Sequence, residues 1–156
     1  MSNEKSSDAK TVEERIALLK RLKGHLVAQR TKFEQYLDIL DLQEDSIQSG
    51  DMERLQAHIE LEKGIIEEIY AFQKVIDPLT DLYRMAYPQA EPEIPLLSAS
   101  LERAKTEALA RNERNRNLLK KNLEMLRQEI ASLRIPKRAK SPYGDVGVPS
   151  MIDITT

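Results

Sequence analysis

The stretch VEERIALLKRLKGHLVAQRTKFEQYLDILDLQEDSI, from Val12 to Ile47, decides the fold. Large apolar residues recur in it every seven positions, at Val12, Leu19, Leu26, Phe33, Leu40 and Ile47. The intermediate positions hold two apolar and three charged residues: Ile16, Leu37, Lys23, Arg30 and Glu44. A seven-residue repeat sustained over this length predicts a long helix. Its charged interruptions fit packing within a bundle at least as well as a symmetric coiled coil.

The residues Ser49-Gly50-Asp51 predict a tight connection to a second helix. Gly permits positive φ just after a helix, and Asp at an N-cap accepts hydrogen bonds from backbone N–H groups. So short a connection predicts an antiparallel hairpin. The second helix carries two apolar stripes and should therefore contact more than one helix. The stripes are Met52, Leu55, Ile59, Ile66, Ile69 and Ile76, and Leu61, Ile65, Phe72, Val75, Leu79 and Leu82.

Proline positions predict where the helices end. Pro78 lacks an N–H group and its ring clashes one turn back, so it predicts a kink or break, or the start of a separate short helix. Pro88, Pro92 and Pro95 predict a loop, and Pro136 ends a third helix. At the other end of the chain, Thr11 and Glu14 have the spacing of a capping box, so residues 1–10 are expected to be frayed.

Together these patterns predict an all-α fold, an elongated antiparallel three-helix bundle made of a helical hairpin and a third long helix. We expect helices over about residues 12–48, 52–77 and 97–134, with a break or kink near Pro78 and a short helix to 87. Residues 1–134 should form a single helical domain, and residues 135–156 a flexible C-terminal tail. The tail nevertheless carries apolar residues: Tyr143, Val146, Val148, Met151, Ile152 and Ile154.

The composition bounds the class of protein. Charged residues make up 32% of the chain and aromatic residues 4%, which suits amphipathic helices better than an enzyme cleft. There is no Cys, which excludes disulfides and thiolate metal sites. The N-terminus has no apolar signal region, and no apolar stretch approaches the length of a membrane span. We therefore expect a soluble, cytoplasmic protein that does not insert into membranes.

Charges are distributed unevenly along the chain. Between Asp38 and Glu68 there are ten acidic and two basic residues, whereas between Arg103 and Lys140 there are twelve basic and four acidic residues. We expect the two regions to attract each other if they lie side by side. The basic run around Arg134, Lys137, Arg138 and Lys140 lacks interleaved aromatic residues, so we do not expect nucleic-acid binding.

The sequence contains no catalytic constellation. His25 and His58 each stand alone without a metal-binding spacing, and phosphate-binding glycine loops are missing. We therefore expect no enzymatic activity, and no catalytic, cofactor-binding or metal-binding residues.

Two features of the third helix have alternative interpretations. Asn112, Asn115 and Asn122 share a face, either as a polar stretch or as buried residues that determine register. The distal half carries an apolar stripe that either packs in the core or docks on a partner helix. The apolar residues of the tail favour docking, because such segments commonly fold on binding. The stripe consists of Leu119, Leu123, Leu126, Ile130 and Leu133.

The chain resembles the FlgN-like flagellar export chaperones in four features. These are the hairpin, the proline-interrupted middle, the short Tyr-Gly tail and the Asn-rich helix ARNERNRNLLKKNLEMLRQEIASL (Ala110 to Leu133). The resemblance covers nearly the whole chain, but it rests on architecture and on this helix. It implies a cytosolic chaperone that binds hook–filament junction (hook-associated) proteins, prevents their premature association and delivers them to the flagellar type III export gate.

In that family the C-terminal part of the chaperone grips its client. The resemblance therefore implies a partner-binding site at Leu119, Leu123, Leu126, Ile130, Leu133, Tyr143, Met151 and Ile152. The basic segment PKRAK, from Pro136 to Lys140, departs from the family pattern and leaves the contacts of the tail open. The alternative is a structural coiled-coil scaffold or adaptor without chaperone activity. The sequence leaves the oligomeric state open.

Overall fold

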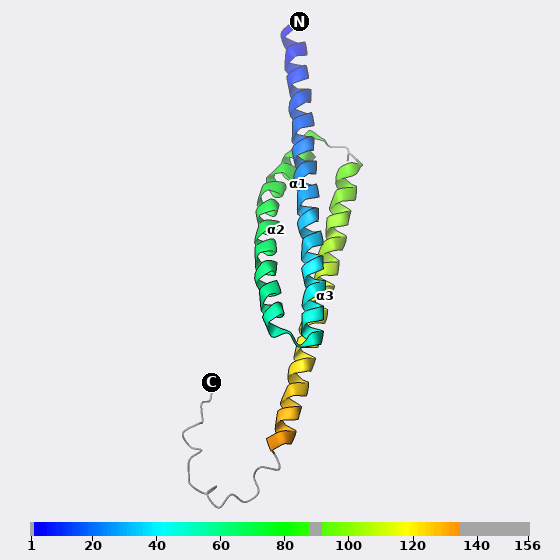
Figure 1. Ribbon diagram of the computed structural model, residues 1–156. Coiled ribbons are helices and arrows are strands. Elements are labelled where there is room, and N and C mark those ends of the chain that lie inside the picture. Colours follow the sequence, from blue (N-terminus) through cyan, green and yellow to red (C-terminus); the bar gives the residue numbers. More distant parts are fainter. Residues whose placement is uncertain (1, 88–91, 135–156) are drawn as a thin grey trace, which may run out of the picture. The chain divides into compact units, whose positions relative to one another are not determined.

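The computed structural model describes residues 2–87 and 92–134. These form three helices, α1 (Ser2–Ser49), α2 (Met52–Ala86) and α3 (Glu93–Arg134) (Figure 1). No strand occurs within these two ranges. The predicted all-α fold, a helical hairpin followed by a third long helix, is therefore confirmed. The predicted tail, residues 135–156, lies outside the described residues.

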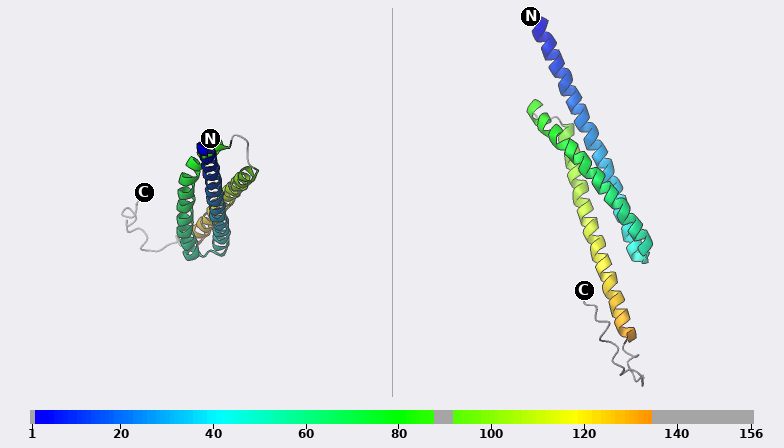
Figure 2. Two further views of the ribbon diagram at one scale, coloured as in Figure 1. Left: turned by 90° about the horizontal axis from the view of Figure 1, so that it is seen from above. Right: turned by 90° about the vertical axis from the view of Figure 1, so that its left-hand side faces the viewer.

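By compactness the chain divides after Leu118 into two units, and each is described by itself. The first unit, Met1–Leu118, holds α1, α2 and the part of α3 that ends at Leu118. Within it, α1 lies between α2 and α3, and consecutive helices run antiparallel (Figures 1 and 2). The described part of the second unit is the helical segment 119–134. A single domain over residues 1–134 stays a prediction.

The turn between α1 and α2 has the geometry that its sequence predicts. Gly50 adopts a positive φ of 73°, and its N–H donates to the Ile47 carbonyl at 3.2 Å. The Asp51 N–H donates to the Ser46 carbonyl at 3.0 Å. The Asp51 carboxylate accepts from the Arg54 N–H at 3.1 Å and so caps the first turn of α2. The predicted hairpin is confirmed.

The start of α1 differs from the prediction. The helix begins at Ser2, so Thr11 and Glu14 lie inside it and do not cap its first turn. Once a helix exists, each further residue adds a hydrogen bond without a new nucleus, and Glu4 in the first turn favours the positive end of the helix dipole. This extension buries no apolar seam, since Val12 and Ile16 are exposed.

Buried side chains of α1 follow spacings of four and three residues. One row, Leu26, Phe33, Leu40 and Ile47, is the predicted seam. The other row is Leu22, Gln29, Tyr36 and Gln43. The predicted intermediate positions, represented by Lys23 and Arg30, are only half-buried. Burying the neighbouring row keeps those charges near water, at the cost of placing two glutamines in the core.

The buried polar groups join α1 to α2 by hydrogen bonds. The Gln29 amide donates to Gln73 Oε1 at 2.9 Å and to the Ile69 carbonyl at 3.3 Å. The Glu62 carboxylate accepts from the Tyr36 hydroxyl at 3.1 Å and from the Gln43 amide at 2.7 Å. Burial, with the Glu62 charge nearby, raises the pKa of the Tyr36 phenol, which therefore stays a donor.

α2 continues through Pro78, so the predicted break and the separate short helix to residue 87 are wrong. The helix curves instead (Figure 1). Proline inside a helix costs about 3 kcal/mol. Ile76, Leu79 and Tyr83 are buried around it, and fully burying a large apolar side chain is worth about 1.5–3 kcal/mol. Their packing outweighs the cost of the proline.

The core of α2 only partly matches the prediction. Leu55 is buried as expected, whereas Ile59, Ile66 and Ile69 are half-buried. The first unit therefore covers the middle of α2 less completely than its ends.

α3 begins at Glu93, four residues before the predicted start, because Pro95 falls in the first turn, where a helix needs no N–H donor. Its buried residues recur every seven positions: Ile94, Leu101, Ala108 and Asn115. None of the described helices is long and apolar enough to cross a membrane.

The predicted attraction between acidic and basic regions is confirmed where α3 meets α1. Arg111 NH1 lies 3.0 Å from Asp41 Oδ2, and Arg114 NH2 lies 3.3 Å from Asp41 Oδ1. Arg114 Nε lies 2.5 Å from Glu44 Oε2. Next to these pairs, the buried Asn115 amide donates to the Leu40 carbonyl at 2.8 Å. Asn115 thus bonds to a backbone carbonyl of α1 and accepts from Arg114, and neither partner is another Asn.

Candidate functional site

The predicted partner-binding residues of the third helix lie on one face of α3 in the second unit. Spacings of four and three residues give a narrow stripe, because a helix turn takes 3.6 residues. Leu119 is half-buried. The exposed fractions of the others are 47% for Leu123, 51% for Leu126, 47% for Ile130 and 68% for Leu133. The side chains beyond Leu119 thus present their apolar surface to solvent and do not form a core.

Charges flank this stripe on one side. Lys120 and Arg127 are exposed, lie seven residues apart and so share a row directly beside the leucines. The opposite flank carries Asn122 and Glu129. Lys121, although adjacent in sequence to Lys120, points about 100° further around the helix and lies away from the stripe. The segment is therefore an apolar seam with one basic edge.

The other predicted partner-binding residues are in the tail. Tyr143, Met151 and Ile152 lie outside the described residues, so their role stays a prediction.

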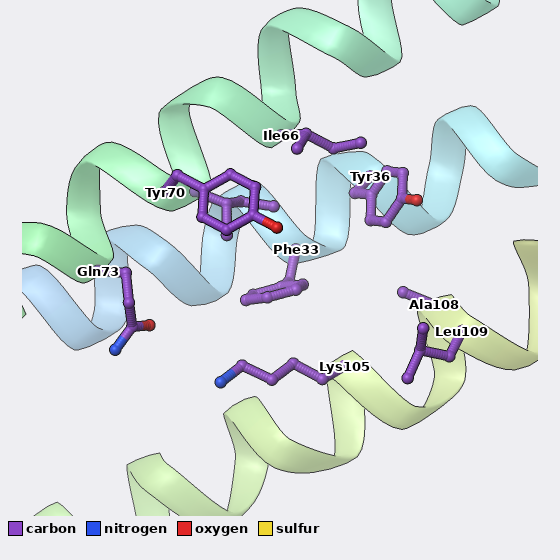
Figure 3. A pocket seen from close by; sticks show the side chains of 9 residues that line it. Phe33, Tyr36, Ile66, Tyr70, Gln73, Lys105, Ala108 and Leu109 are labelled. Carbon is purple, nitrogen blue, oxygen red and sulfur yellow. The ribbon is translucent and has the colours of Figure 1, made fainter.

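A second candidate site is a cavity of about 380 Å³ in the first unit, between α1, α2 and α3 (Figure 3). Phe33 and Ala108 on its wall are buried, while Tyr70 and Leu109 at its margin are exposed. Its lining residues are Phe33, Tyr36, Ile66, Ile69, Tyr70, Gln73, Lys105, Ala108 and Leu109.

Two of the polar side chains at this cavity have partners, and the Tyr70 hydroxyl also lies at its margin. Gln73 accepts from Gln29 and donates to Asp77 at 2.6 Å, and Lys105 pairs with Glu102 at 3.2 Å. Apart from this hydroxyl, the lining is mainly hydrocarbon surface. The cavity therefore suits an aliphatic or aromatic group and offers no arrangement for acid–base chemistry.

The histidines stand apart from both candidates. His58 Nδ1 lies 3.3 Å from Ser46 Oγ, and the His25 ring is 6.3 Å from the Phe72 ring. Within residues 2–87 and 92–134, no group of three or more His, Asp or Glu side chains is placed to hold a metal ion.

Comparison with known proteins places the chain beside a protein of Treponema pallidum (strain Nichols). The two are 36% identical over 123 residues, which cover 79% of each chain. The chain belongs to the family of this treponemal protein. The relative is described as an uncharacterized protein, so the family assigns no activity. No protein-family model matches the chain, and no solved structure matches it.

The sequence pattern of this family member predicted the stripe but not the cavity. The cavity exists because α3 presents Ala108 where the same seven-residue row elsewhere carries Ile94 and Leu101. A small residue in a row of large ones is a signal that the sequence does contain. This signal can be interpreted only if the face of α3 that meets α1 is known. That part of α3 has few apolar residues, so its sequence pattern did not identify the face.

Proposed function

We propose that this protein is a cytosolic export chaperone of the FlgN-like kind, which binds the terminal amphipathic helices of hook–filament junction proteins and delivers them to the flagellar type III export apparatus. The observation that carries the proposal is the exposed stripe from Leu123 to Leu133 on a well-formed helix. Four large aliphatic side chains exposed along one helix face are typical of a surface that another helix covers.

The stripe supplies enough apolar surface for helix capture. Fully burying one Leu or Ile side chain is worth about 1.5–3 kcal/mol, and the four exposed residues retain roughly half of their surface for a client to cover. Part of that gain is spent on ordering and restricting the client. A chaperone of this kind holds its client while leaving release possible at the export gate.

The basic edge specifies the client further. A helix that covers the leucines runs beside Lys120 and Arg127, and edge residues of paired helices select partners by charge. The client helix should therefore carry acidic residues at seven-residue spacing along the edge that meets this row. Such pairs contribute more to the choice of partner and to the association rate than to affinity.

The proposal is tested with the double variant Leu123→Ser/Ile130→Ser. We expect it to lose capture of the C-terminal helices of a hook–filament junction protein in a calorimetric titration, by roughly 100-fold or more if both residues are central anchors. Because both side chains are exposed, circular dichroism and the melting temperature should stay close to those of the parent.

Met125→Ser is the matched control, because Met125 is also exposed but lies about 120° around the same helix from the centre of the stripe. It should bind the client like the parent. A double variant that stays folded and binds with unchanged affinity would show that the stripe is not the client site.

A further inference from the structure

The outer face of α2 carries a second apolar seam that the first unit leaves largely exposed. Eight residues follow one another at spacings of four and three, and all are exposed. They are Ala57, Leu61, Gly64, Glu68, Ala71, Val75, Pro78 and Leu82. The residues that turn toward α1 lie elsewhere on the helix, as the bond from Gln29 to Gln73 shows. Over about 38 Å of helix, α2 therefore has one face that packs against α1 and a second, exposed face that touches α1 at its edge through Glu68 and Leu82.

A solvated helix face normally consists of charged residues, and this one does not. Only Glu68 among the eight is charged, and it forms an ion pair with Lys32 of α1. The large apolar members are 56% exposed at Leu61, 40% at Val75 and 51% at Leu82. Such a continuous seam is typical of a helix that pairs with another helix.

The seam is complementary in shape to a second, antiparallel copy of itself. Its large residues, Leu61, Val75 and Leu82, occupy one heptad position, and its small residues, Ala57, Gly64 and Ala71, occupy the other. When two such helices run antiparallel, each position faces the other kind. In that register Val75 meets Gly64 of the second copy, and Leu82 meets its Ala57. Glu68 meets Ala71 and Leu61 meets Pro78, so three of the four layers set a large residue against a small one, an arrangement that packs tightly.

We propose that the outer face of α2 is a dimer interface, at which α2 of a second copy of this chain packs antiparallel in the register that sets Val75 against Gly64. The interface is isologous, so every contact occurs twice about a two-fold axis. It lies on the first unit and is independent of the client site on the second, so it stands whether or not the proposed function does.

Charges along the edge support this orientation. Glu67 and Lys74 are exposed and seven residues apart, and in the antiparallel register Glu67 lies beside Lys74 of the second copy, twice. Further out, Glu60 lies near Asp81 of the second copy, also twice, and this repulsion offsets part of the attraction. A parallel pair would instead set Glu68 against Glu68 and Leu61 against Leu61, with facing glycines between them. The antiparallel arrangement is favoured on both charge and shape.

The experiment uses the absence of Cys from the natural chain. Gly64→Cys and Val75→Cys are prepared as separate full-length variants, since a Cβ at Gly64 meets nothing within 4 Å. Under mild oxidation, a mixture of the two should give a disulfide-linked dimer of one chain of each kind. Each variant alone should link poorly, because its two cysteines would lie about 16 Å apart along the antiparallel pair.

If each variant links efficiently with itself and the mixture gives no dimer of one chain of each kind, the pair is parallel and the proposal is overturned. Absence of linking in all samples, with a monomeric mass in sedimentation equilibrium at high protein concentration, would overturn it as well. Linking through client or another protein is excluded because the purified chain is used alone.

A charge exchange supplies a second readout that needs no Cys. Glu67→Lys should raise the dimer dissociation constant by about tenfold, because it sets Lys against Lys at two places. Lys74→Glu should do the same, and the double variant Glu67→Lys/Lys74→Glu should restore the parent value. Equal dissociation constants for all four proteins would contradict the proposed register.

Discussion

The side-chain amide of Asn115 donates to the backbone carbonyl of Leu40 across 2.8 Å, and both residues are buried. The bond joins two helices that are far apart in the sequence, and Arg111 and Arg114 form ion pairs with the neighbouring Asp41. A buried polar group of this kind is costly unless it is paired, so it favours one register of α3 against α1 over its neighbours.

Asn115→Ala should therefore destabilise the fold. Loss of the buried bond is expected to cost about 1–3 kcal/mol, more than the gain in helix propensity from Ala. Asn117→Ala is the control, because Asn117 is exposed on the same helix and shares the propensity gain. The free energy of unfolding, from urea titration followed by circular dichroism, should fall for the first variant and not for the second.

The core seam is tested by comparing two positions of the same seven-residue row. Leu26 is buried and Val12 is exposed. Leu26→Ala should cost about 2–5 kcal/mol, whereas Val12→Ala should change stability by less than about 0.5 kcal/mol. Thermal unfolding measures both. An unchanged melting temperature for Leu26→Ala would show that the buried rows of α1 are misassigned.

Stability at high pH should depend on Tyr36. Burial beside Glu62 raises the pKa of the Tyr36 phenol above its value of about 10 in the unfolded chain. As the pH rises past about 10, the unfolded chain releases a proton that the folded chain retains, so the free energy of unfolding falls. Below that pH both states keep the proton, and this contribution to stability is fully present.

Tyr36→Phe removes both the hydrogen bond and this titration. It should cost about 1–2 kcal/mol at neutral pH, where the bond to Glu62 is intact. The difference between the two free energies of unfolding should shrink between about pH 8 and about pH 10.5, because only the parent has the Tyr36 proton, which its unfolded chain releases in this range. Guanidinium titrations at both pH values measure it. A constant difference would mean that Tyr36 ionises normally in the folded protein.

The basic edge of the client-binding stripe is tested by reversing adjacent charges. Lys120 lies beside the stripe and Lys121 away from it, so the two substitutions to Glu change the net charge equally. Lys120→Glu should weaken capture of a synthetic amphipathic helix with glutamates on both edges by about three- to tenfold at low salt, and Lys121→Glu should have little effect. A matching peptide with lysines on its edges should show the opposite preference. Equal effects of the two variants would indicate general electrostatic attraction and no charged edge.

Periodicity made much of the first unit predictable. Leu26, Phe33 and Leu40 are apolar at regular spacing, and Gly50-Asp51 is a local turn signal, so both could be recognised without knowledge of the partner helix. The burial of Gln29 and Gln43 could not, because an apolar pattern omits polar residues that enter a core with hydrogen-bonding partners from another helix. Continuity through Pro78 was missed for a similar reason. The cost of a proline within a helix is evident from the sequence, whereas the compensating burial of Leu79 and Tyr83 depends on tertiary packing.

The candidate site divides in the same way. The spacing of Leu123 and Ile130 predicted an apolar stripe, but only the structure shows that these side chains are exposed. The sequence pattern did not reveal the outer seam of α2, because its small members, Ala57 and Gly64, add little to an apolar periodicity. The predicted stripe that contains Leu61 also included Phe72 and Leu79, which pack against or within the core.

α3 is uninterrupted from Glu93 to Arg134, which has a consequence for how the client-binding segment orders itself. A free peptide of that segment would have to form its own helical nucleus, an event disfavoured by a factor of roughly 10⁻³. In the intact chain the preceding turns already exist, because Leu101, Ala108 and Asn115 are buried. The helix beyond Leu118 therefore only propagates, one hydrogen bond at a time, and frays from its far end. Under the proposed function, a client would meet a gradient of order, with a persistent platform near Leu119 and Leu123 and a last turn near Leu133 that becomes ordered as the client covers it.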